Sequence, residues 1–399
     1  MCHLGNNSST RIFLVKRIIV FWVFCLIGLS SALADSVRVS VVTCSPGDEA
    51  YSLFGHTGLR YCNSDDGTDI VFSYGYFNFN APNFVWRFIL GETDYMVGAV
   101  PYNHFIREYE ERGSAVVEQV LDLTAGQESA LYSALVNNCR EENRVYRYNY
   151  FYNNCTTRVR DQVYSVAGDV AYVGAGVPAL TFREALAGMT SSHPWYAFGI
   201  DLLLGADVDE PASRSALQFI PAFFMNDLDM AHVSGTPLVK EKRILLHEQP
   251  RVHEGSNATP FNVSLLFLLF TMIVILCEIR HNRIYWGFDI VIMLLQGLSG
   301  LLLLFMSLFS SHPAVGCNCL MLLLNPLALI IMPIMVYRTI NRKTVTVAWF
   351  QVAFVLIFFI SAIIQLQVYP VPVYFCAVAL LARSLFHLYK DRICELNLL

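Results

Sequence analysis

The chain divides into two parts by the distribution of its apolar residues. Between residues 35 and about 255, apolar and polar positions alternate or recur at helical spacing, as in a water-exposed domain. From residue 261 onward, long apolar segments without charge dominate. The pattern therefore predicts a globular domain followed by a region of membrane-spanning helices.

The first part alternates between short strands and helices. Period-two alternation predicts strands over 36–43, 57–61, 69–76, 116–123 and 144–152. Helical spacing predicts helices over 83–90, 102–112, 124–136, where Thr124 caps the first turn, and 155–166. We therefore predict an α+β domain over 35–235, and we interpret the segment 236–260, which contains several Pro and Gly residues, as a linker.

Residues 261–399 are predicted to form an all-α membrane domain of five transmembrane helices. Charged residues are absent from 261–277, 290–337 and 344–382. The second stretch is long enough for two spans, and Pro370 and Pro372 mark a turn between two spans in the third. The last span continues past Arg383 into the tail.

The basic residues of the short loops predict the orientation of these helices. They occur in two loops and the tail, at Arg280, Arg283, Arg338, Arg342, Lys343, Arg383, Lys390 and Arg392. The opposite loops, 311–319 and 367–373, contain no Lys or Arg. Because basic loops stay in the cytoplasm, we expect a cytoplasmic C-terminus and residue 260 on the other side.

The N-terminus has the features of a secretory signal peptide covering residues 1–34. Arg11, Lys16 and Arg17 precede an apolar stretch over 18–29, and Ala32-Leu33-Ala34 fits a cleavage site. The alternative is an uncleaved anchor. Either interpretation places the α+β domain in the periplasm or outside the cell, in agreement with the loop charges.

Composition excludes several classes of function. Charged residues make up 15% of the chain and hydrophobic residues 55%, whereas a soluble domain usually carries about 25% charge. The net charge of −5 provides no basic field for nucleic acid. His104, His193 and His232 are scattered without metal-ligand spacing, so we predict no metal and no cofactor.

Two segments carry candidate chemistry. His56 stands at the start of a predicted strand within 52–60, and Cys155 stands at the first turn of a predicted helix within 150–161. A helix N-terminus stabilises a thiolate, and a nearby histidine completes a nucleophile and base pair. The alternative is a buried structural cysteine and a histidine that caps a strand. Ser73 and Tyr74, on the strand after the histidine, are the candidates for a group that orients it.

Several motifs together resemble one family. A histidine on a strand followed by a cysteine at a helix start is similar to the circularly permuted papain-like domain of the lecithin:retinol acyltransferase type. The segments 72–79 (FSYGYFNF) and 199–205 (GIDLLLG), with those around His56 and Cys155, resemble the periplasmic domain of the Lnb-type bacterial lipoprotein N-acyltransferases. Ser311-His312-Pro313, Asn318 and Asn325-Pro326 resemble the membrane part of that family. Ser73 departs from the pattern, in which we expect an amide such as Asn.

The resemblance implies an activity in the bacterial inner membrane. His56 deprotonates Cys155, and the thiolate takes an acyl chain from a membrane phospholipid as a thioester. The backbone N–H of Cys155 or Thr156, together with Asn154, stabilises the oxyanion. The chain then passes to the α-amino group of a diacylglyceryl-cysteine lipoprotein, so the implied partners are a phospholipid donor and a diacylated lipoprotein acceptor.

Other residues have two interpretations each. Arg60 either contacts a phosphate headgroup or is a charge at a strand edge. Arg158 either binds phosphate or is structural, since Asp161 offers a salt-bridge partner. His312, Asn318 and Asn325 either contact headgroups at the membrane surface or cap helices. Cys44 and Cys62 could form a disulfide across neighbouring strands, whereas a bond between Cys139 and Cys155 would block the nucleophile, and we expect none.

Two further classes of function remain. A papain-like cysteine peptidase or amidase acting on cell-envelope peptides would use the same Cys155 and His56, but it needs no domain with several spans. A membrane receptor or assembly factor with a degenerate domain would need neither residue, and both are present.

Overall fold

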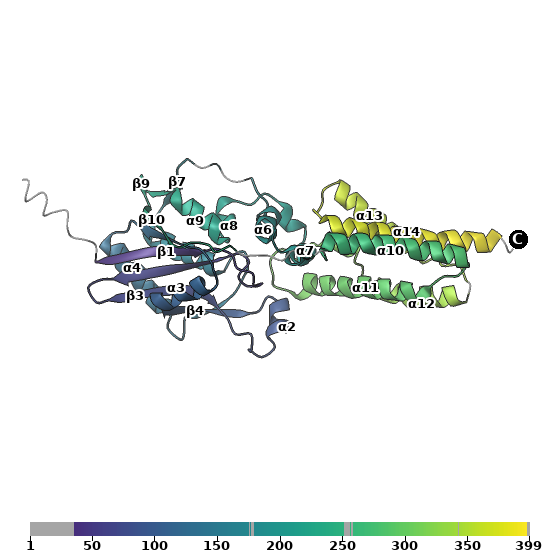
Figure 1. The fold of residues 1–399 in the computed structure, drawn as a ribbon, viewed down its shortest axis with the longest axis horizontal. Coiled ribbons are helices and arrows are strands. Elements are labelled where there is room, and N and C mark those ends of the chain that lie inside the picture. The colour runs from purple at the N-terminus through teal and green to yellow at the C-terminus, as the bar shows by residue number, and fades with distance from the viewer. Residues whose placement is uncertain are drawn as a thin grey trace, which may run out of the picture.

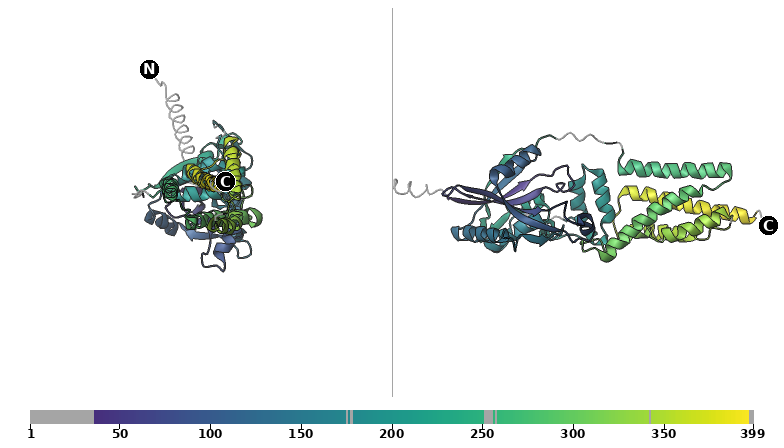
Figure 2. Two further views of the ribbon diagram at one scale, coloured as in Figure 1. Left: turned by 90° about the vertical axis from the view of Figure 1, so that its right-hand side faces the viewer. Right: turned by 90° about the horizontal axis from the view of Figure 1, so that it is seen from below.

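The computed structural model describes residues 36–174, 176, 179–250, 256, 258–341 and 343–396. A mixed α and β domain lies at one end of an elongated molecule and a bundle of helices at the other (Figure 1). Perpendicular views show the same division (Figure 2). The predicted signal peptide and Arg342 lie outside the described residues, as does the side chain of Arg392.

A seven-stranded antiparallel sheet forms the frame of the N-terminal domain, with strand order β10-β5-β1-β2-β3-β4-β6. Its strands are β1 (Val37–Cys44), β2 (His56–Asn63), β3 (Thr68–Tyr76), β4 (Asp94–Pro101), β5 (Val116–Leu121), β6 (Val145–Arg147) and β10 (Val239–Leu246). A small sheet contains β7 (Val170–Tyr172), β8 (Ala231–Val233) and β9 (Thr236–Pro237). The predicted α+β class is confirmed, and the structure adds that the large sheet is antiparallel.

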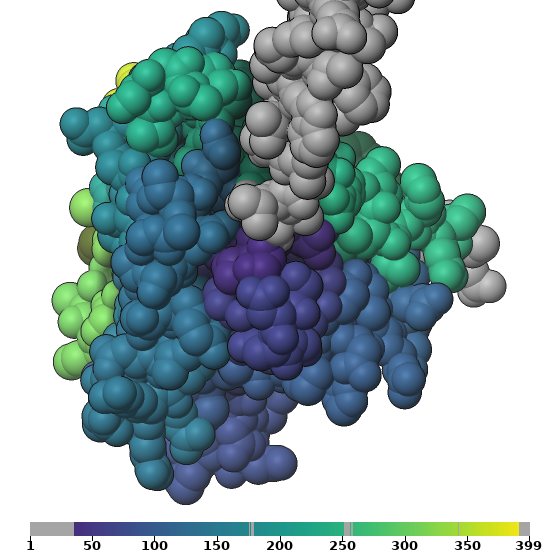
Figure 3. Space-filling model, turned by 90° about the vertical axis from the view of Figure 1, so that its left-hand side faces the viewer, coloured from purple at the N-terminus to yellow at the C-terminus, as the bar shows by residue number. Residues whose placement is uncertain are grey.

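The two faces of the large sheet are covered by different helices. Alternate residues such as Leu59 and Phe72 pack in one core with helices α4 (Ala125–Asn138), α5 (Cys155–Ala167) and α9 (Pro221–Asp229). The opposite face, which includes Val42 and Val71, packs on α3 (Tyr102–Glu111). Residues of this domain also form the end of the molecule opposite the helical region (Figure 3). The period-two side-chain alternation of strands therefore separates two cores.

The sheet contains strands that the sequence pattern did not indicate. β4 was not predicted, and β10 lies within the segment that we interpreted as a linker. β10 is an edge strand with four consecutive positions Lys240–Arg243 all charged, so its apolar periodicity is weak. The strand predicted over 144–152 shortens to β6, because the Asn149 side chain accepts backbone hydrogen bonds from Phe151 and Tyr152 and turns the chain.

Short helices fill the space between the sheet and the helical region. They are α2 (Phe84–Ile89), α6 (Phe182–Thr190), α7 (Pro194–Leu203), the 3-10 helix η1 (Ala206–Asp209) and α8 (Arg214–Leu217). The last four surround a satellite core that contains Phe151 and Phe219. Figure 1 shows α2 and α7 near the ends of the long helices.

The C-terminal region is helical and apolar. Three of its described helices are long and apolar enough to cross a membrane, namely α10 (Pro260–His281), α11 (Trp286–Phe309) and the 371–390 part of α14 (Val371–Leu396). Two shorter apolar helices are α12 (Ala328–Ile340), which follows the 3-10 helix η2 (Cys319–Leu322), and α13 (Ala348–Ile363). Gly300 of α11 lies so close to the Leu324 carbonyl that a Cβ there would be 2.2 Å from its oxygen.

The helical region encloses a cluster of charged side chains. Arg383 is buried in α14 rather than placed in the tail, which corrects the sequence interpretation. It donates hydrogen bonds to both carboxylate oxygens of Asp289 at 2.6 and 2.8 Å and is also bonded to Glu278. His387 contacts the same Asp289 oxygen at 3.1 Å. These mutually paired charges lock three helices together, as expected for ionisable groups inside a helical bundle.

Backbone contacts fix the N-terminal domain on the helical region. The Gly205 N–H donates to the Ala314 carbonyl at 2.7 Å, and the Ala206 N–H donates to that of Cys317 at 2.9 Å. Arg183 stabilises the same junction, because it donates hydrogen bonds to Asp201, to Asp209 and to the Gly205 carbonyl. The tight fit at Gly205 follows from the absence of a side chain, since a Cβ there would lie 2.8 Å from the Cys317 oxygen.

Substitution of Gly205 tests this junction. Gly205→Ala is expected to destabilise the junction by about 1–3 kcal/mol, because the added methyl group overlaps backbone atoms that cannot move aside easily. Thermal unfolding in detergent and protease cleavage between the two parts measure the effect. Gly199→Ala in α7 is the matched control, because an added Cβ there meets nothing within 4 Å. Equal unfolding temperatures for the two variants would contradict a rigid junction.

Candidate active site

Cys155 occupies the first turn of α5, and Asn154 fixes that turn. The Asn154 side-chain oxygen accepts hydrogen bonds from the Thr156 and Thr157 N–H groups, both at 2.9 Å. Its amide nitrogen donates to the carbonyls of Tyr150 and Phe219 at 3.0 and 2.8 Å. Through these bonds the buried Asn154 caps α5 and also joins the helix to two other segments.

His56 begins β2 and lies opposite Cys44 of β1 in the sheet register. The preceding Gly55 has a φ of 80°, and a Cβ there would lie 2.5 Å from the Cys44 carbonyl oxygen, so only glycine fits this entry to the strand. The His56 Nε2 lies 2.6 Å from the Ser73 Oγ of β3. Ser73 therefore fixes the ring and leaves Nδ1 for a second partner.

The second partner of His56 is the thiol of Cys155. Burial raises the pKa of this thiol, but the charge of His56 and its hydrogen bond to the sulfur lower it, and the net shift is downward. The Thr57 N–H and the Thr156 hydroxyl, 3.7 Å from the sulfur, add to the lowering. This combination favours the thiolate form of Cys155 relative to an ordinary buried thiol, at the start of a helix.

Tyr76 joins the site through an irregularity in β3, and the sequence analysis did not identify it. Regular alternation would place Tyr76 on the face of Tyr74, but the register shifts between these residues, and Gly75 has a φ of 104°. The Ser73 hydroxyl hydrogen-bonds with the Tyr76 phenol, whose ring packs against Gly98 of β4. The Gly75 bulge is the signal that could have indicated this placement.

The residues predicted to support catalysis, Ser73, Tyr74, Asn154 and Thr156, have different surroundings in the structure. Ser73 contacts His56, whereas Tyr74 is buried in the core and accepts a hydrogen bond from Asn138 at 2.9 Å. The Thr156 N–H is occupied by Asn154, so it is not free to stabilise an oxyanion, and neither is the Asn154 amide. Among the described residues, the Cys155 N–H has no acceptor, which leaves it available for that role.

The two arginines proposed for headgroup binding have protein partners. Arg60 is buried and pairs with Asp69 at 2.7 Å and Glu118 at 3.1 Å, with its guanidinium 3.4 Å from the centre of the Tyr102 ring. Burial opposes its charge, but these carboxylates raise the pKa of Arg60 overall. Arg158 donates to Asn153 at 2.6 Å and lies over the Tyr146 ring. Arg60 therefore forms ion pairs within the protein, whereas Arg158 contacts an amide and a ring, and Asp161 pairs with Arg160 instead.

The three polar residues of the C-terminal region lie at junctions rather than beside Cys155. The His312 Nε2 is 2.6 Å from the Phe88 carbonyl oxygen of α2. The Asn318 amide donates to the Leu202 carbonyl of α7 at 2.8 Å, and its oxygen accepts from the Leu320 N–H. The Asn325 oxygen accepts from the Leu327 N–H at 2.9 Å before α12. Their contacts match the helix-capping interpretation, extended to interdomain contacts.

The described cysteines of the N-terminal domain are free thiols. Cys44 lies opposite His56, and Cys62 lies opposite Arg38, which precedes Cys44 by six residues in β1. Six residues of a strand span roughly 20 Å, so the suggested bond between Cys44 and Cys62 cannot form. Cys139 and Cys155 are also unbonded, which leaves Cys155 available as a nucleophile.

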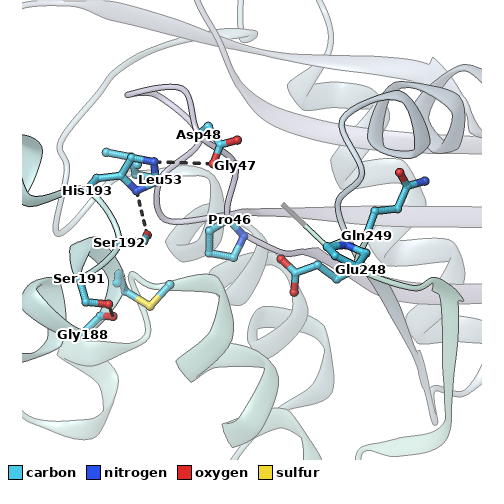
Figure 4. Close-up of a pocket in the computed structure, with 12 residues that line it drawn as sticks. Pro46, Gly47, Asp48, Leu53, Gly188, Ser191, Ser192, His193, Glu248 and Gln249 are labelled. Carbon is cyan, nitrogen blue, oxygen red and sulfur yellow. Dashed lines mark hydrogen bonds and ion pairs between the residues drawn. The ribbon is translucent and has the colours of Figure 1, made fainter. Parts of the chain in front are cut away.

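The structure also contains a separate hollow of about 650 Å³ (Figure 4). Its walls come from the loop after β1, the end of α6 and the segment after β10, and they include Asp48, His193 and Glu248. The His193 Nε2 is 3.6 Å from an Asp48 oxygen. Neither Cys155 nor His56 lines the hollow, and no group of three metal-ligating side chains occurs within the described residues.

The lowered pKa of Cys155 predicts a distinct alkylation profile. Iodoacetamide should modify Cys155 at a pH below that required by an ordinary thiol, since the pKa is lowered by His56. His56→Ala removes that charge, so the midpoint should move upward. Peptide mapping by mass spectrometry at each pH measures the modification of individual cysteines. Cys44 is an internal control, because burial strongly raises the pKa of its thiol; an unchanged midpoint in His56→Ala would refute the pairing.

Comparison with known proteins places both parts of the chain. The Lnb N-terminal periplasmic domain matches residues 28–188, and the Lnb transmembrane domain, whose family name denotes five transmembrane helices, matches residues 252–392. No curated protein and no solved structure matches the chain. The matched segments contain His56, Cys155 and the long apolar helices, so the first part is a periplasmic domain and the second a multi-span membrane domain. The chain therefore belongs to the Lnb family.

Proposed function

We propose that this chain is a lipoprotein N-acyltransferase that carries an acyl chain on Cys155 from a phospholipid to the α-amino group of a diacylglyceryl-cysteine lipoprotein. The observation that carries the proposal is the pairing of the Cys155 thiol with His56, which Ser73 holds in place. Membership of the Lnb family, which implies lipid and lipoprotein substrates, supports it.

The order and geometry of the pair correspond to a circularly permuted papain-like domain. His56 lies on a strand and precedes Cys155, which lies at a helix start, and a third polar group holds the ring nitrogen that faces away from the thiol. This arrangement serves acyl transfer through a thioester. The domain boundaries that we propose remain 35–235 for the catalytic domain and 261–399 for the membrane domain, although β10 extends the folded part beyond residue 235.

In the first step, the phospholipid acylates the enzyme. The His56 Nδ1 takes the proton of Cys155, and the sulfur attacks the carbonyl carbon of a phospholipid ester. The bond between that carbon and the glycerol oxygen breaks, and His56 returns the proton to this oxygen. A lysophospholipid leaves, and a thioester remains on Cys155. In this scheme the His56 Nε2, 2.6 Å from the Ser73 Oγ, keeps its proton and donates to that oxygen, which maintains the tautomer that the steps require.

In the second step, the amine of the lipoprotein takes the acyl chain. His56 removes a proton from the amine while its nitrogen attacks the thioester carbonyl, and the bond from carbon to sulfur breaks. The departing thiolate is restored to the paired state with the imidazolium. In both steps the free Cys155 N–H at the start of α5 stabilises the negative oxygen, assisted by the positive end of the helix dipole.

The position of the site suits substrates that stay in a membrane. β2 begins and β3 ends at the side of the sheet that faces the helical region (Figure 1), and His56, Ser73 and Cys155 meet there. We propose five membrane crossings, with α12 and α13 completing the three long helices, and a cytoplasmic C-terminus. Both lipid substrates then reach the site from the periplasmic leaflet of the inner membrane.

Analysis of a lipoprotein N-terminus tests the proposal. In cells depleted of their own N-acyltransferase, expression of this chain should add a third acyl chain to the amine of a model lipoprotein. Cys155→Ala should abolish the addition, because no thioester can form. Mass spectrometry of the N-terminal lipopeptide distinguishes the two products.

Cys139→Ala is the matched control, because Cys139 is also a free, partly buried cysteine and ends the helix next to α5. This variant should behave as the native chain. Persistent diacylated lipopeptide with the native chain would contradict the lipoprotein assignment. Cleavage of envelope peptides that depends on Cys155 would instead favour the peptidase or amidase.

The chain of hydrogen bonds behind His56 generates a second prediction. Ser73→Ala should lower acyl transfer about tenfold, because His56 loses the partner that fixes its tautomer and orientation. Tyr76→Phe should have a smaller effect in the same direction, and Ser73→Asn should restore the rate through its amide oxygen. Rates are measured with detergent-solubilised enzyme, together with the pH at which Cys155 is alkylated.

Ser165→Ala is the control, since the Ser165 hydroxyl bonds only to its own helix at the Gln162 carbonyl. A merely structural role of Ser73 would lower the amount of folded enzyme without moving the alkylation midpoint. Unchanged rate and unchanged midpoint in Ser73→Ala would show that the serine does not position His56.

A further inference from the structure

Helix α2 presents apolar side chains that the N-terminal domain does not cover. Val85 is 71% exposed, Trp86 54% and Phe88 46%, and Phe79 in the preceding loop is 62% exposed. No residue of the helix is buried. Such a concentration of large apolar groups on a folded domain marks a surface for a partner.

The position of α2 on the membrane domain is fixed by three hydrogen bonds. The Ile89 carbonyl accepts from Ser310 Oγ at 2.7 Å and the Leu90 carbonyl from the Ser311 N–H at 2.8 Å. The Phe88 carbonyl lies 2.6 Å from the His312 Nε2. Gly91 completes the fit, because a Cβ there would be 2.7 Å from the His312 nitrogen. The apolar side chains are therefore held at one height relative to α11.

That height corresponds to the last turns of α11, which is long and apolar enough to cross a membrane. The Trp86 ring is 5.1 Å from the ring of Phe305, and Phe305 contacts Phe309 at the end of α11. Phe305 precedes the end of α11 by four residues, or about 6 Å along the helix. Interfacial helices bury their apolar face about 5–10 Å into the boundary of headgroups and acyl chains. The exposed side chains of α2 thus continue the exposed apolar surface of α11.

We propose that α2 lies in the periplasmic leaflet and delivers the acyl donor, so that a phospholipid chain enters the site along the aromatic side chains that connect α2 with Cys155. The occupant of this surface is a membrane phospholipid. The first half of the inference, insertion of α2, stands on its own geometry, whereas the second half rests on the proposed acyl transfer.

A series of ring contacts leads from α2 toward the end of β3, next to Cys155. Ring centres are separated by 6.2 Å from Phe88 to Phe84, 5.9 Å from Phe84 to Phe77 and 4.9 Å from Phe77 to Tyr95. Phe77 follows Gly75 by two residues, and a Cβ on Gly75 would lie 3.8 Å from the Cys155 Cβ. An acyl chain that moves along these rings would leave its lipid neighbours and contact apolar protein surface instead. It would keep such contacts until its ester reaches the thiol.

Quenching of Trp86 by lipid tests insertion directly. The full chain is placed in phosphatidylglycerol and phosphatidylethanolamine nanodiscs, with or without bromine in the upper part of the acyl chains. The emission attributable to Trp86 is the difference between the native chain and Trp86→Phe. Bromine should remove about half or more of that emission, and iodide in the water should have little effect, as for an interfacial ring. Emission sensitive to iodide and insensitive to bromine would overturn the insertion.

A matched pair of charge substitutions tests delivery. Val85→Asp places a carboxylate at the membrane boundary and should lower kcat/KM for the phospholipid donor about tenfold. Turnover of a soluble short-chain thioester donor should stay within about twofold, because the Cys155 pair is untouched. Val173→Asp is the control, since Val173 is 57% exposed and follows β7, far from the helical region (Figure 1).

The outcomes separate this inference from the proposed function. Equal kcat/KM values for the two aspartate variants, with N-acylation intact, would refute delivery along α2 and leave the acyltransferase assignment standing. Quenching of Trp86 by brominated lipid in a protein that adds no acyl chain would confirm insertion and refute the proposed function.

Discussion

The hydrogen bonds of Asn154 are the constraint on which the rest of the site depends. One side chain accepts from two N–H groups of α5 and donates to two carbonyls, those of Tyr150 and Phe219. The helix start, the loop before it and the satellite core are thereby held together. Because the thiol follows Asn154 directly, its position relative to the sheet is set by this cap. Replacing four backbone partners of a buried side chain is costly, so the arrangement tolerates little variation.

The sheet contributes the other half through two departures from regular geometry. The left-handed Gly55 brings the chain into β2 with His56 as its first residue, and the Gly75 bulge ends β3 with Tyr76 beside Ser73. Cys155 comes from a helix on one face of the sheet. His56 lies at the start of β2 and Ser73 near the end of β3, both of which are interior strands. The pair therefore forms where β2 is no longer paired with β3, which frees the Thr57 N–H for the sulfur.

The sequence predicted those features that depend on local pattern. Half of the strands, helices α2 to α5, the Thr124 cap and the start of a helix at Cys155 follow from periodicity and capping chemistry. Asn154, which was predicted to stabilise an oxyanion, is instead the cap of α5. The sequence could not predict β10, whose charges conceal an edge strand, or the burial of Arg383, whose partners are distant in sequence. The sequence also could not decide whether Ser73 or Tyr74 orients His56, because only the strand register and the bulge determine which side chain faces the histidine.

The contacts at the junction between the two parts hold the periplasmic domain at a fixed height relative to the membrane domain. A linker alone would let the periplasmic domain rotate above the bilayer. Instead, Gly205, His312 and Gln367 make contacts from three separate segments, so rigid-body rotation would break them together. In the proposed acyl transfer, a thiol held at one height requires the phospholipid ester to rise to it, so that the acyl chain leaves the hydrocarbon. Apolar protein surface along the proposed path would lower the cost of this transfer, so the fixed height of the site and the proposed aromatic route support each other.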